Sequence, residues 1–197
     1  MSILSQLKRA LPKNTVIFGS ENTRPFECDG LSVYKQEPLA VVLPNNIAQI
    51  KKVIEICRKN NTPIVSRGAG TGLSGGATPL EGSVVLGFSK LTQIISIDKE
   101  KKIAVLEPGV RNLAISEAVE EFGLYYAPDP SSQIACTIGG NVAENAGGVH
   151  CLKYGLTVQN VEAIKMLTID GEELLLTRQD EGIGLLALMN GSEGLLG

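Results

Sequence analysis

The chain has 197 residues, 43% of them hydrophobic and 20% charged, with 18 basic against 21 acidic residues for a net charge of −3. Such a chain buries a sizeable core as one large domain or two small ones. No run of five like charges occurs, so nothing indicates a nucleic-acid partner. No apolar stretch approaches the roughly 18 residues of a membrane span, and the N-terminal stretch is too short for a signal peptide. We therefore expect a globular cytoplasmic protein without a membrane span.

The cysteines and the single histidine indicate neither a metal site nor a catalytic nucleophile. Cys28, Cys57, Cys136 and Cys151 are scattered without a CxxC pair, so a tetrahedral zinc site would need long-range convergence. Free cysteines are usually buried, and we expect reduced, mostly buried thiols. His150 precedes Cys151, but neighbouring residues of an extended chain point to opposite faces, which disfavours a Cys–His pair. We predict no catalytic residue and no metal ligand.

The first half of the chain indicates a βαβ unit. Residues 1–37 lack a regular pattern and are expected to wrap the outside of the fold. The apolar run 39–43 is typical of a buried strand, and residues 47–57 repeat apolar side chains at helical spacing. A second strand at 63–66 leads directly into a glycine-rich run. Further short strands, with two hairpin-like pairings among them, are expected at 83–88, 94–97 and 103–106.

The second half indicates a helix, a long irregular stretch and a hairpin. Residues 112–122 carry a mostly one-sided apolar face that ends at Gly123, where a C-cap glycine is expected. Residues 128–155 are rich in glycine and small residues and fit no regular element, a length of loop that is usually functional. The segments 161–169 and 173–176 flank Asp170-Gly171, which predicts a two-residue hairpin turn. The second half is therefore expected to be largely antiparallel.

The glycine-rich run Arg67 to Gly76 matches GxGxxG at Gly70 to Gly75, but its context is wrong for a nicotinamide dinucleotide. That fingerprint needs a helix to start at the loop and an acidic residue about 20 positions later. Here a turn-like segment, Thr78 to Gly82, follows instead, and no acid is found around Phe88 to Leu91. A P-loop is excluded as well, because Gly75 is not followed by Lys-Ser/Thr.

What remains is a glycine-rich loop whose amides can converge on an anion without a helix. Glycine tolerates positive φ and lets the backbone approach a ligand closely, as in an anion-binding nest. A diphosphate suits this geometry. For Arg67 two interpretations stay open: a charged hydrogen bond to the anion, or a solvated or ion-paired arginine at the end of its strand.

Several motifs together carry a family resemblance that runs from Tyr34 to Gly197. The chain resembles the FAD-linked subunits of bacterial glycolate oxidases, within the vanillyl-alcohol-oxidase-type (PCMH-type) FAD-binding fold. The densest matches are RGAGTGLSGG at 67–76, PGVRNLAIS at 108–116, YYAPDPSSQIAC at 125–136, IGGNVAENAGGVHCLKYGLT at 138–157 and GSEGLLG at 191–197.

The resemblance implies an α+β fold of two lobes, residues 1–97 with a βαβ unit and residues 98–197 with a largely antiparallel sheet. It implies FAD held non-covalently, because no His, Cys or Tyr lies between Arg67 and Gly76. The first glycine-rich loop would bind the pyrophosphate, and the second would line the flavin and ribityl chain. The implied cofactor-binding residues are Arg67, Gly68, Ala69, Gly70, Thr71, Gly72, Leu73, Ser74, Gly75, Pro128, Asp129, Ser131, Ser132, Thr137, Gly139, Gly140, Asn141, Ala143, Asn145, Gly148 and Glu193.

The resemblance also implies a function for a longer protein. Relatives continue beyond the position of Gly197 into a further strand and a substrate-binding cap, so we expect this chain to be the FAD-binding portion of such a protein and inactive alone. The expected activity is oxidation of a short 2-hydroxy acid, glycolate or D-lactate, by hydride transfer to FAD, with partner subunits that could hold the protein at the inner membrane. Two alternatives stay open: a non-catalytic FAD-binding or docking module, and an FAD enzyme with different chemistry. For His150, packing within its loop is preferred over a role as general base.

Overall fold

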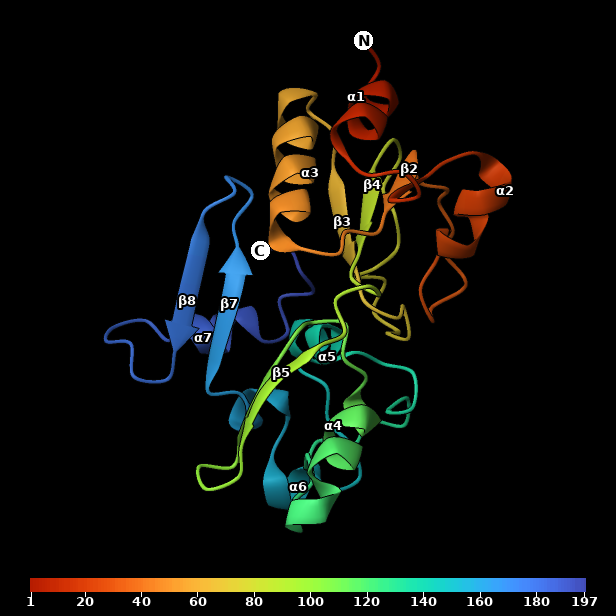
Figure 1. Ribbon diagram of the computed structural model, residues 1–197. Helices are drawn as coiled ribbons and strands as arrows, with labels where there is room; N and C mark the ends of the chain where they lie inside the picture. Colours follow the sequence, from red (N-terminus) through yellow and green to blue (C-terminus); the bar gives the residue numbers. More distant parts are fainter.

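The computed structural model describes residues 1–197 and has a parallel sheet in its first half (Figure 1). The sheet has the order β1-β2-β4-β3, in which β2, β4 and β3 run parallel and β1 pairs antiparallel with β2. The expected βαβ unit is confirmed, and β4 lies between its two strands. The strands are β1 (Val16–Ile17), β2 (Ala40–Val42), β3 (Ile64–Arg67) and β4 (Val84–Gly87).

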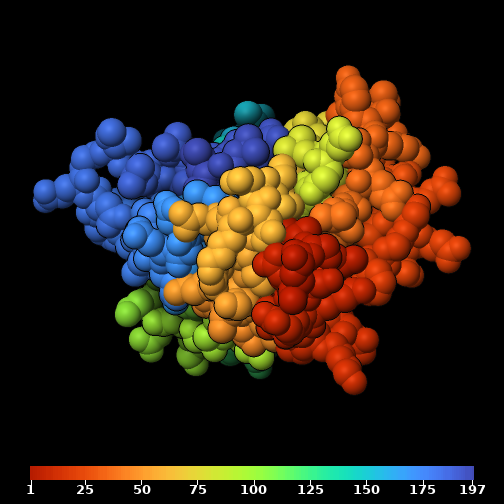
Figure 2. Space-filling model, turned by 90° about the horizontal axis from the view of Figure 1, so that it is seen from above, coloured from red at the N-terminus to blue at the C-terminus, as the bar shows by residue number.

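Two helices cover one face of this sheet, α1 (Ile3–Ala10) and α3 (Ile47–Lys59). Seen from above, α1 lies directly against α3 (Figure 2). The Asn46 side chain caps α3 by accepting a hydrogen bond from the Gln49 amide, so that one of the unpaired N–H donors at the helix start gains a partner. The main core cluster joins both helices to the sheet; its members are Leu7, Leu11, Val42, Ile50, Val53, Ile54, Ile56, Cys57, Val84, Leu86 and Leu91.

The first 37 residues are therefore more ordered than their sequence pattern indicates. Leu7 reaches the core from α1, and Leu11 reaches it from the position directly after the helix. The other face of the sheet buries Val41, Val65 and Val85, with Phe26 packed against them. Phe26 belongs to η1 (Arg24–Phe26), which follows α2 (Ser20–Thr23). Residues 1–37 thus supply part of the covering on both faces, and the prediction of an irregular outer wrap was wrong for α1.

Two separate antiparallel hairpins follow the sheet, as the sequence indicates. β5 (Ile94–Asp98) pairs with β6 (Ile103–Leu106), and β7 (Ala163–Leu167) pairs with β8 (Glu173–Thr177). β4 joins neither hairpin, because it pairs in parallel with β2 and β3, so only one of the two hairpin-like pairings expected among 83–106 forms. The proposed lobe boundary after residue 97 falls within β5.

The β7–β8 hairpin closes with a longer turn than predicted. The amide of Thr168 donates to the Glu172 carbonyl, so three residues rather than two lie between them. Gly171 takes a φ of +81°, the left-handed conformation that the third residue of such a loop needs. The hairpin lies beside α3, where Lys51 and Arg58 reach Glu173 and Asp170 at 2.8 and 2.7 Å.

Short helices fill the rest of the second half, and two of them lie where the sequence predicts irregular chain. The helix predicted at 112–122 is confirmed as α4 (Asn112–Val119) continued by η2 (Glu120–Phe122), with Gly123 left-handed at its end. Within 128–155 the structure has α5 (Ile138–Glu144) and α6 (Cys151–Tyr154), followed by η3 (Thr157–Asn160) and, later, α7 (Leu185–Met189).

The helix α5 escaped prediction because it is seven residues long and begins Ile-Gly-Gly. Glycine is a poor helix former, so propensity gives no signal. Its ends are fixed by side chains and backbone geometry instead: Thr137 accepts from the Gly140 amide, and Asn145 ends the helix in the left-handed conformation. None of the helices in the molecule is long and apolar enough to cross a lipid bilayer.

Candidate functional site

The glycine-rich loop leaves the end of β3 and continues to residue 79 without forming a helix, as predicted. Gly70 and Gly75 have φ values of +72° and +82°, a region in which side chains with a Cβ are strained. The absence of a helix agrees with the exclusion of a nicotinamide fingerprint, which requires one at this point.

Arg67, the last residue of β3, is buried beneath the loop. Its guanidinium donates to the carbonyl oxygens of Cys28 at 2.8 Å and Ala77 at 3.3 Å, and it stacks over the Phe26 ring at 5.6 Å. Burial lowers the pKa of this guanidinium, against the opposing effect of the nearby Cys28 and Asp29. Gly70 packs so closely on the guanidinium that a Cβ would collide with it. Arg67 therefore shapes the loop from below and is not a solvated arginine.

The glycine-rich loop packs against α5, so that the two glycine-rich stretches of the sequence meet. A Cβ on Gly68 would collide with the Thr137 hydroxyl, and one on Gly72 would lie 2.6 Å from Glu144 Oε1. Ser74 donates its hydroxyl to the other Glu144 oxygen at 2.8 Å. Backbone contacts as close as these are open only to glycine. Two regions about 70 residues apart thus form one surface.

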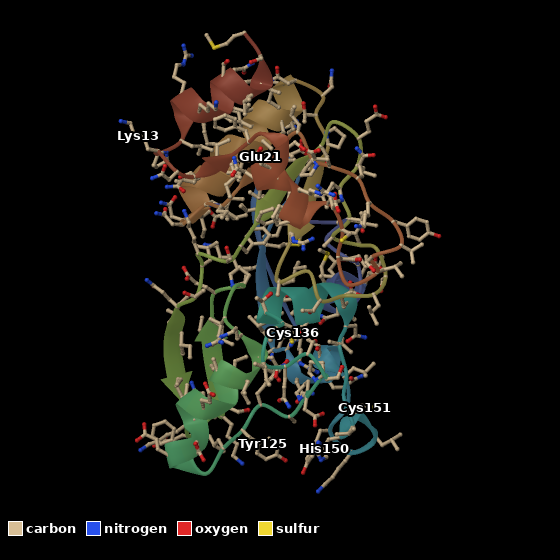
Figure 3. The ribbon with its side chains drawn as sticks, turned by 90° about the vertical axis from the view of Figure 1, so that its right-hand side faces the viewer. Lys13, Glu21, Tyr125, Cys136, His150 and Cys151 are labelled. Atoms are coloured by element: carbon tan, nitrogen blue, oxygen red, sulfur yellow. The ribbon has the colours of Figure 1, made fainter.

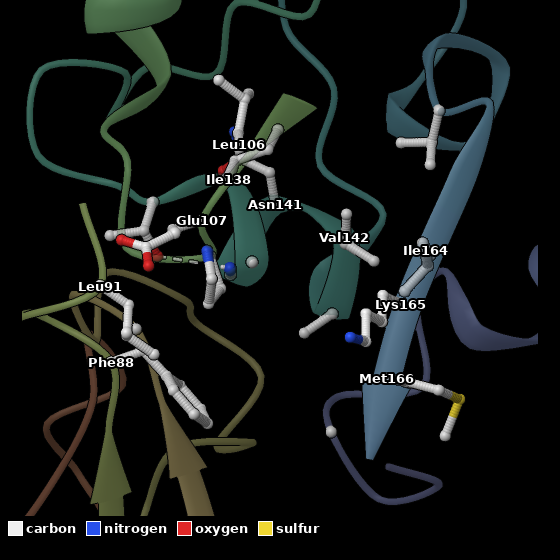
Figure 4. A pocket seen from close by; sticks show the side chains of 18 of the residues that line it. Phe88, Leu91, Leu106, Glu107, Ile138, Asn141, Val142, Ile164, Lys165 and Met166 are labelled. Carbon is white, nitrogen blue, oxygen red and sulfur yellow. Dashed lines mark hydrogen bonds between the residues drawn. The ribbon is translucent and has the colours of Figure 1, made fainter. Parts of the chain in front are cut away.

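A large cleft of about 1860 Å³ opens beside this surface, compared with roughly 300–1,000 Å³ for ordinary ligand pockets. One end is polar and includes Gly68 to Gly72, Thr137 and Asn141. The rest is lined mostly by apolar side chains, with charged ones such as Glu107 and Lys165 among them, and lies between the end of β4, α5 and β7 (Figure 4). There the lining side chains include Phe88, Leu91, Leu106, Ile138, Val142, Ile164 and Met166.

The polar end of the cleft gathers more than half of the residues predicted to bind a cofactor. Those that line it are Arg67, Gly68, Ala69, Gly70, Thr71, Gly72, Ser132, Thr137, Gly139, Gly140, Asn141, Ala143 and Glu193. Those that lie outside its lining are Leu73, Ser74, Gly75, Pro128, Asp129, Ser131, Asn145 and Gly148. The second group falls at the edges of the two loops.

Asn141 is the polar side chain of this end that most clearly lacks a partner. It is 2% exposed, and its Nδ2 donor makes no hydrogen bond. An unpaired buried donor costs roughly 1–3 kcal/mol, so native proteins rarely leave one without a use. Glu193 reaches the same area from the C-terminal segment, where its amide donates to the Ala143 carbonyl at 2.8 Å and its side chain packs on Gly76.

Asp129 and His150 form a pair at the end of the molecule away from the parallel sheet, where Figure 3 labels His150 near Tyr125. Asp129 Oδ2 lies 2.5 Å from His150 Nδ1. This hydrogen bond is the main reason that the pKa of Asp129 falls below its usual range. His150 lies outside the cleft lining, and its ring bonds to Asp129. It is the residue directly before α6, so the chain at Cys151 is helical and not extended as assumed.

Sequence reasoning missed Asp29, a buried carboxylate beside the glycine-rich loop. It is 6% exposed and lines the cleft; Oδ1 accepts from the Leu31 amide, and Oδ2 has no partner. The adjacent Gly30 packs against the carbonyl oxygens of Thr71 and Gly72. A signal existed in the Asp29-Gly30 pair, which is typical of a turn, but only the fold brings it to the loop.

Of the four cysteines, Cys57 and Cys136 are buried while Cys28 and Cys151 are half-buried, and none is in a disulfide.

Comparison with known proteins identifies the domain. Residues 38–177 match the family model described as FAD binding domain. The chain is 53% identical over its whole length to the glycolate oxidase subunit GlcD of Escherichia coli and 36% identical over 99% of its length to a D-lactate dehydrogenase of Anaerostipes hadrus. It spans 40% and 42% of the length of these two relatives.

The solved structures show the same fold at low sequence identity. An alkyldihydroxyacetonephosphate synthase matches 99% of the chain with a TM-score of 0.83 at 21% identity, and the chain covers 41% of that protein. The grass pollen allergen Phl p 4 matches 98% of the chain with a TM-score of 0.81 at 18% identity, and 41% of it is covered. The predicted α+β, PCMH-type fold is thereby confirmed. The chain belongs to the FAD binding domain family, and FAD is its cofactor.

Proposed function

We propose that the pyrophosphate of FAD lies against the loop Gly68 to Gly75 at the polar end of the cleft. The residues there fit such a group in two ways. Gly68, Gly70 and Gly72 leave no room for a Cβ on their packed sides, as expected where backbone must approach both a neighbour and a ligand. The unpaired Asn141 amide offers a buried donor, and phosphate, ribityl and flavin groups all present acceptors.

The remaining predicted residues divide by their position in the structure. Six of them line the cleft and would contact FAD directly: Ser132, Thr137, Gly139, Gly140, Ala143 and Glu193. Six others lie outside the lining and would shape the edges of the FAD site: Leu73, Ser74, Gly75, Pro128, Ser131 and Asn145. Arg67 would act from beneath the loop by holding its shape, since its guanidinium is bonded to two carbonyl groups. Because the loop contains no His, Cys or Tyr, we propose that FAD is held without a covalent bond.

We further propose that the full-length protein is a flavin-dependent 2-hydroxy-acid dehydrogenase. The observation that carries this proposal is the 53% identity to a glycolate oxidase subunit along the whole chain, supported by the D-lactate and D-2-hydroxyglutarate dehydrogenases among the relatives. Bound FAD would accept a hydride from the C2 carbon of the acid. The role of this chain would be to bind FAD and to exclude water from it, with the substrate site supplied by the rest of the protein.

Partner subunits are proposed from the same relationship, because the E. coli relative is named as a subunit of glycolate oxidase. We place the protein in the cytoplasm and propose that partner subunits hold it at the inner membrane.

The test is anaerobic addition of glycolate, D-lactate or D-2-hydroxyglutarate to the full-length protein while its flavin absorbance is followed. Bleaching of the flavin bands by at least one of these acids is expected. Persistent oxidised flavin with all three would contradict the proposed activity. It would leave FAD binding by this chain untouched, since that is measured separately by titration.

A further inference from the structure

The Asp129–His150 pair joins the two ends of a long loop. Its carboxylate and imidazole lie 21 positions apart in sequence and 2.5 Å apart in space. The segment between them contains α5, which begins nine residues after Asp129 and ends six residues before His150. The pair therefore closes a loop with a helix inside it, a compact form that surface loops with a function often take.

This closed loop carries most of the second set of proposed FAD-binding residues. They are Ser131, Ser132, Thr137, Gly139, Gly140, Asn141, Ala143, Asn145 and Gly148. The loop makes few apolar core contacts, because neither hydrophobic core cluster includes any of its residues. Its shape depends instead on polar contacts: in its middle the Ile138 amide donates to the Val110 carbonyl and the Ala143 carbonyl accepts from the Glu193 amide, and its two ends meet at the Asp129–His150 pair.

The contact between the loop ends has several parts. The His150 amide donates to Asp129 Oδ1 at 3.4 Å while the ring meets Oδ2, so one carboxylate holds both the backbone and the side chain of His150. Gly148 packs against the Asp129 carbonyl with no space for a Cβ. Asp129 is largely covered, although His150 is 62% exposed. An exposed polar pair alone contributes little, but here it fixes the position of a glycine turn.

Neighbouring elements hold the same two ends. Asn112 of α4 donates to the Pro128 carbonyl at 3.0 Å, next to Asp129. Thr157 donates its hydroxyl to the Ala146 carbonyl at 2.7 Å, two residues before Gly148. The titratable groups around the pair are Tyr154, whose ring lies 6.4 Å from that of His150, together with Tyr125 and Lys153 beside Tyr154. Each end of the loop is thus anchored separately, and only Asp129 and His150 join one end to the other by side-chain hydrogen bonding.

We infer that Asp129 and His150 are positioning residues that lock the 129–150 loop in the form that presents Thr137 to Asn141 to FAD. The inference rests on the proposed location of FAD at the polar end of the cleft. Asp129 acts through His150 from behind the site and does not itself touch the cofactor, which departs from the direct contact expected from the family resemblance.

The test uses His150→Ala, which removes the ring, and His150→Asn, whose amide can replace the Nδ1 donor. The matched control is Leu152→Ala, on the same turn, whose side chain is 100% exposed. FAD affinity is measured by titration, and amide hydrogen exchange at Ala146 and Cys151 reports on the loop. Loss of one charge-assisted hydrogen bond should weaken FAD binding by about five- to tenfold in His150→Ala and speed hydrogen exchange at both amides. His150→Asn should recover part of the affinity and of the protection from exchange. Leu152→Ala should change neither.

The outcomes separate this inference from the proposed function. If the wild-type chain binds FAD and His150→Ala binds it equally well with unchanged exchange, the inference is overturned and the FAD site stands. If the wild-type chain does not bind FAD, the proposed site fails, and exchange alone decides: faster exchange in His150→Ala supports the lock, and unchanged exchange overturns it.

Discussion

The first 91 residues and the rest of the chain are held together by different means. Both hydrophobic core clusters consist of residues up to Leu91, in a sheet covered on both faces. The later part has two two-stranded hairpins, short helices and long loops, and large apolar side chains such as Ile95 and Leu175 are exposed on its strands. Burial of apolar area is concentrated in the first region, whereas the second buries fewer apolar side chains, such as Ile115 and Leu176, and depends more on hydrogen bonds and close glycine contacts.

The proposed FAD site lies where these two regions meet, and each contributes one part. The glycine-rich loop is fixed at the end of a buried strand, while α5 and its flanking loop are held mainly by polar contacts. Binding of FAD should therefore order the second region more than the first. The comparison predicts that damage to the first region costs stability, and that damage to the second costs affinity.

The largest effect is expected from Leu7→Ala in the core. Leu7 is completely buried between α1 and the sheet, so its truncation leaves a cavity and should lower the free energy of unfolding by about 2–4 kcal/mol. The matched change Leu175→Ala on β8, at a side chain that is 66% exposed, should stay within about 0.5 kcal/mol. Urea unfolding followed by circular dichroism measures both, and equal losses would remove the contrast between the two regions.

Gly68→Ala should reduce FAD affinity by about tenfold or more, because the new Cβ collides with the Thr137 hydroxyl and separates the loop from α5. Gly184→Ala is the control, since its Cβ would meet only Ala187 at 3.9 Å. Fluorescence titration with FAD measures the two affinities. If Gly68→Ala binds like the wild type, the contact between the loop and α5 plays no part in cofactor binding.

Asn141→Ala tests the unpaired amide. If FAD accepts a hydrogen bond from Nδ2, its loss should weaken binding by about five- to tenfold, while removal of an unsatisfied donor should leave the stability of the FAD-free chain unchanged or raised. A control is Asn45→Ala, an exposed side chain that also lies on the cleft lining. Unchanged FAD affinity together with reduced stability would show that Asn141 has a structural role only.

The smallest effect concerns pH. The His150 hydrogen bond lowers the pKa of Asp129, so the ionised carboxylate stabilises the native loop, and this contribution is fully present above the usual aspartate pKa of about 3.9 and is lost as pH falls through the lowered value. The difference in urea midpoint between the wild type and His150→Ala should shrink as pH falls below about 4. A difference that widens below pH 4 would contradict the assignment.

Sequence patterns predicted the elements whose formation depends mainly on residues close together in the chain. The strand at 39–43, the helix at 47–57 and the glycine-rich loop follow from periodicity and from the special backbone of glycine. The amphipathic α1 was missed even though Ile3, Leu7 and Leu11 repeat every fourth residue, because its first residues were judged only as a possible signal sequence.

The features that were missed in the site depend on contacts between distant residues. α5 is a poor helix by propensity and exists through its caps and its packing on the loop. The bond between Asp129 and His150, like the burial of Asp29 against the loop, joins positions far apart in the chain, so no local pattern contains it. The family resemblance supplied the residues of the proposed site, and the structure divides them into those that line the cleft and those that lie outside its lining.

The central claim, that FAD lies where the glycine-rich loop meets α5, is tested most directly by amide chemical-shift mapping of the ¹⁵N-labelled chain during FAD titration. The account predicts that the largest shifts occur in 68–72 and 137–148, with Gly184 and the exposed β8 residue Leu174, neither of which lines the cleft, unaffected. Shifts confined to the β5–β6 and β7–β8 hairpins, with the two glycine-rich stretches unchanged, would contradict it.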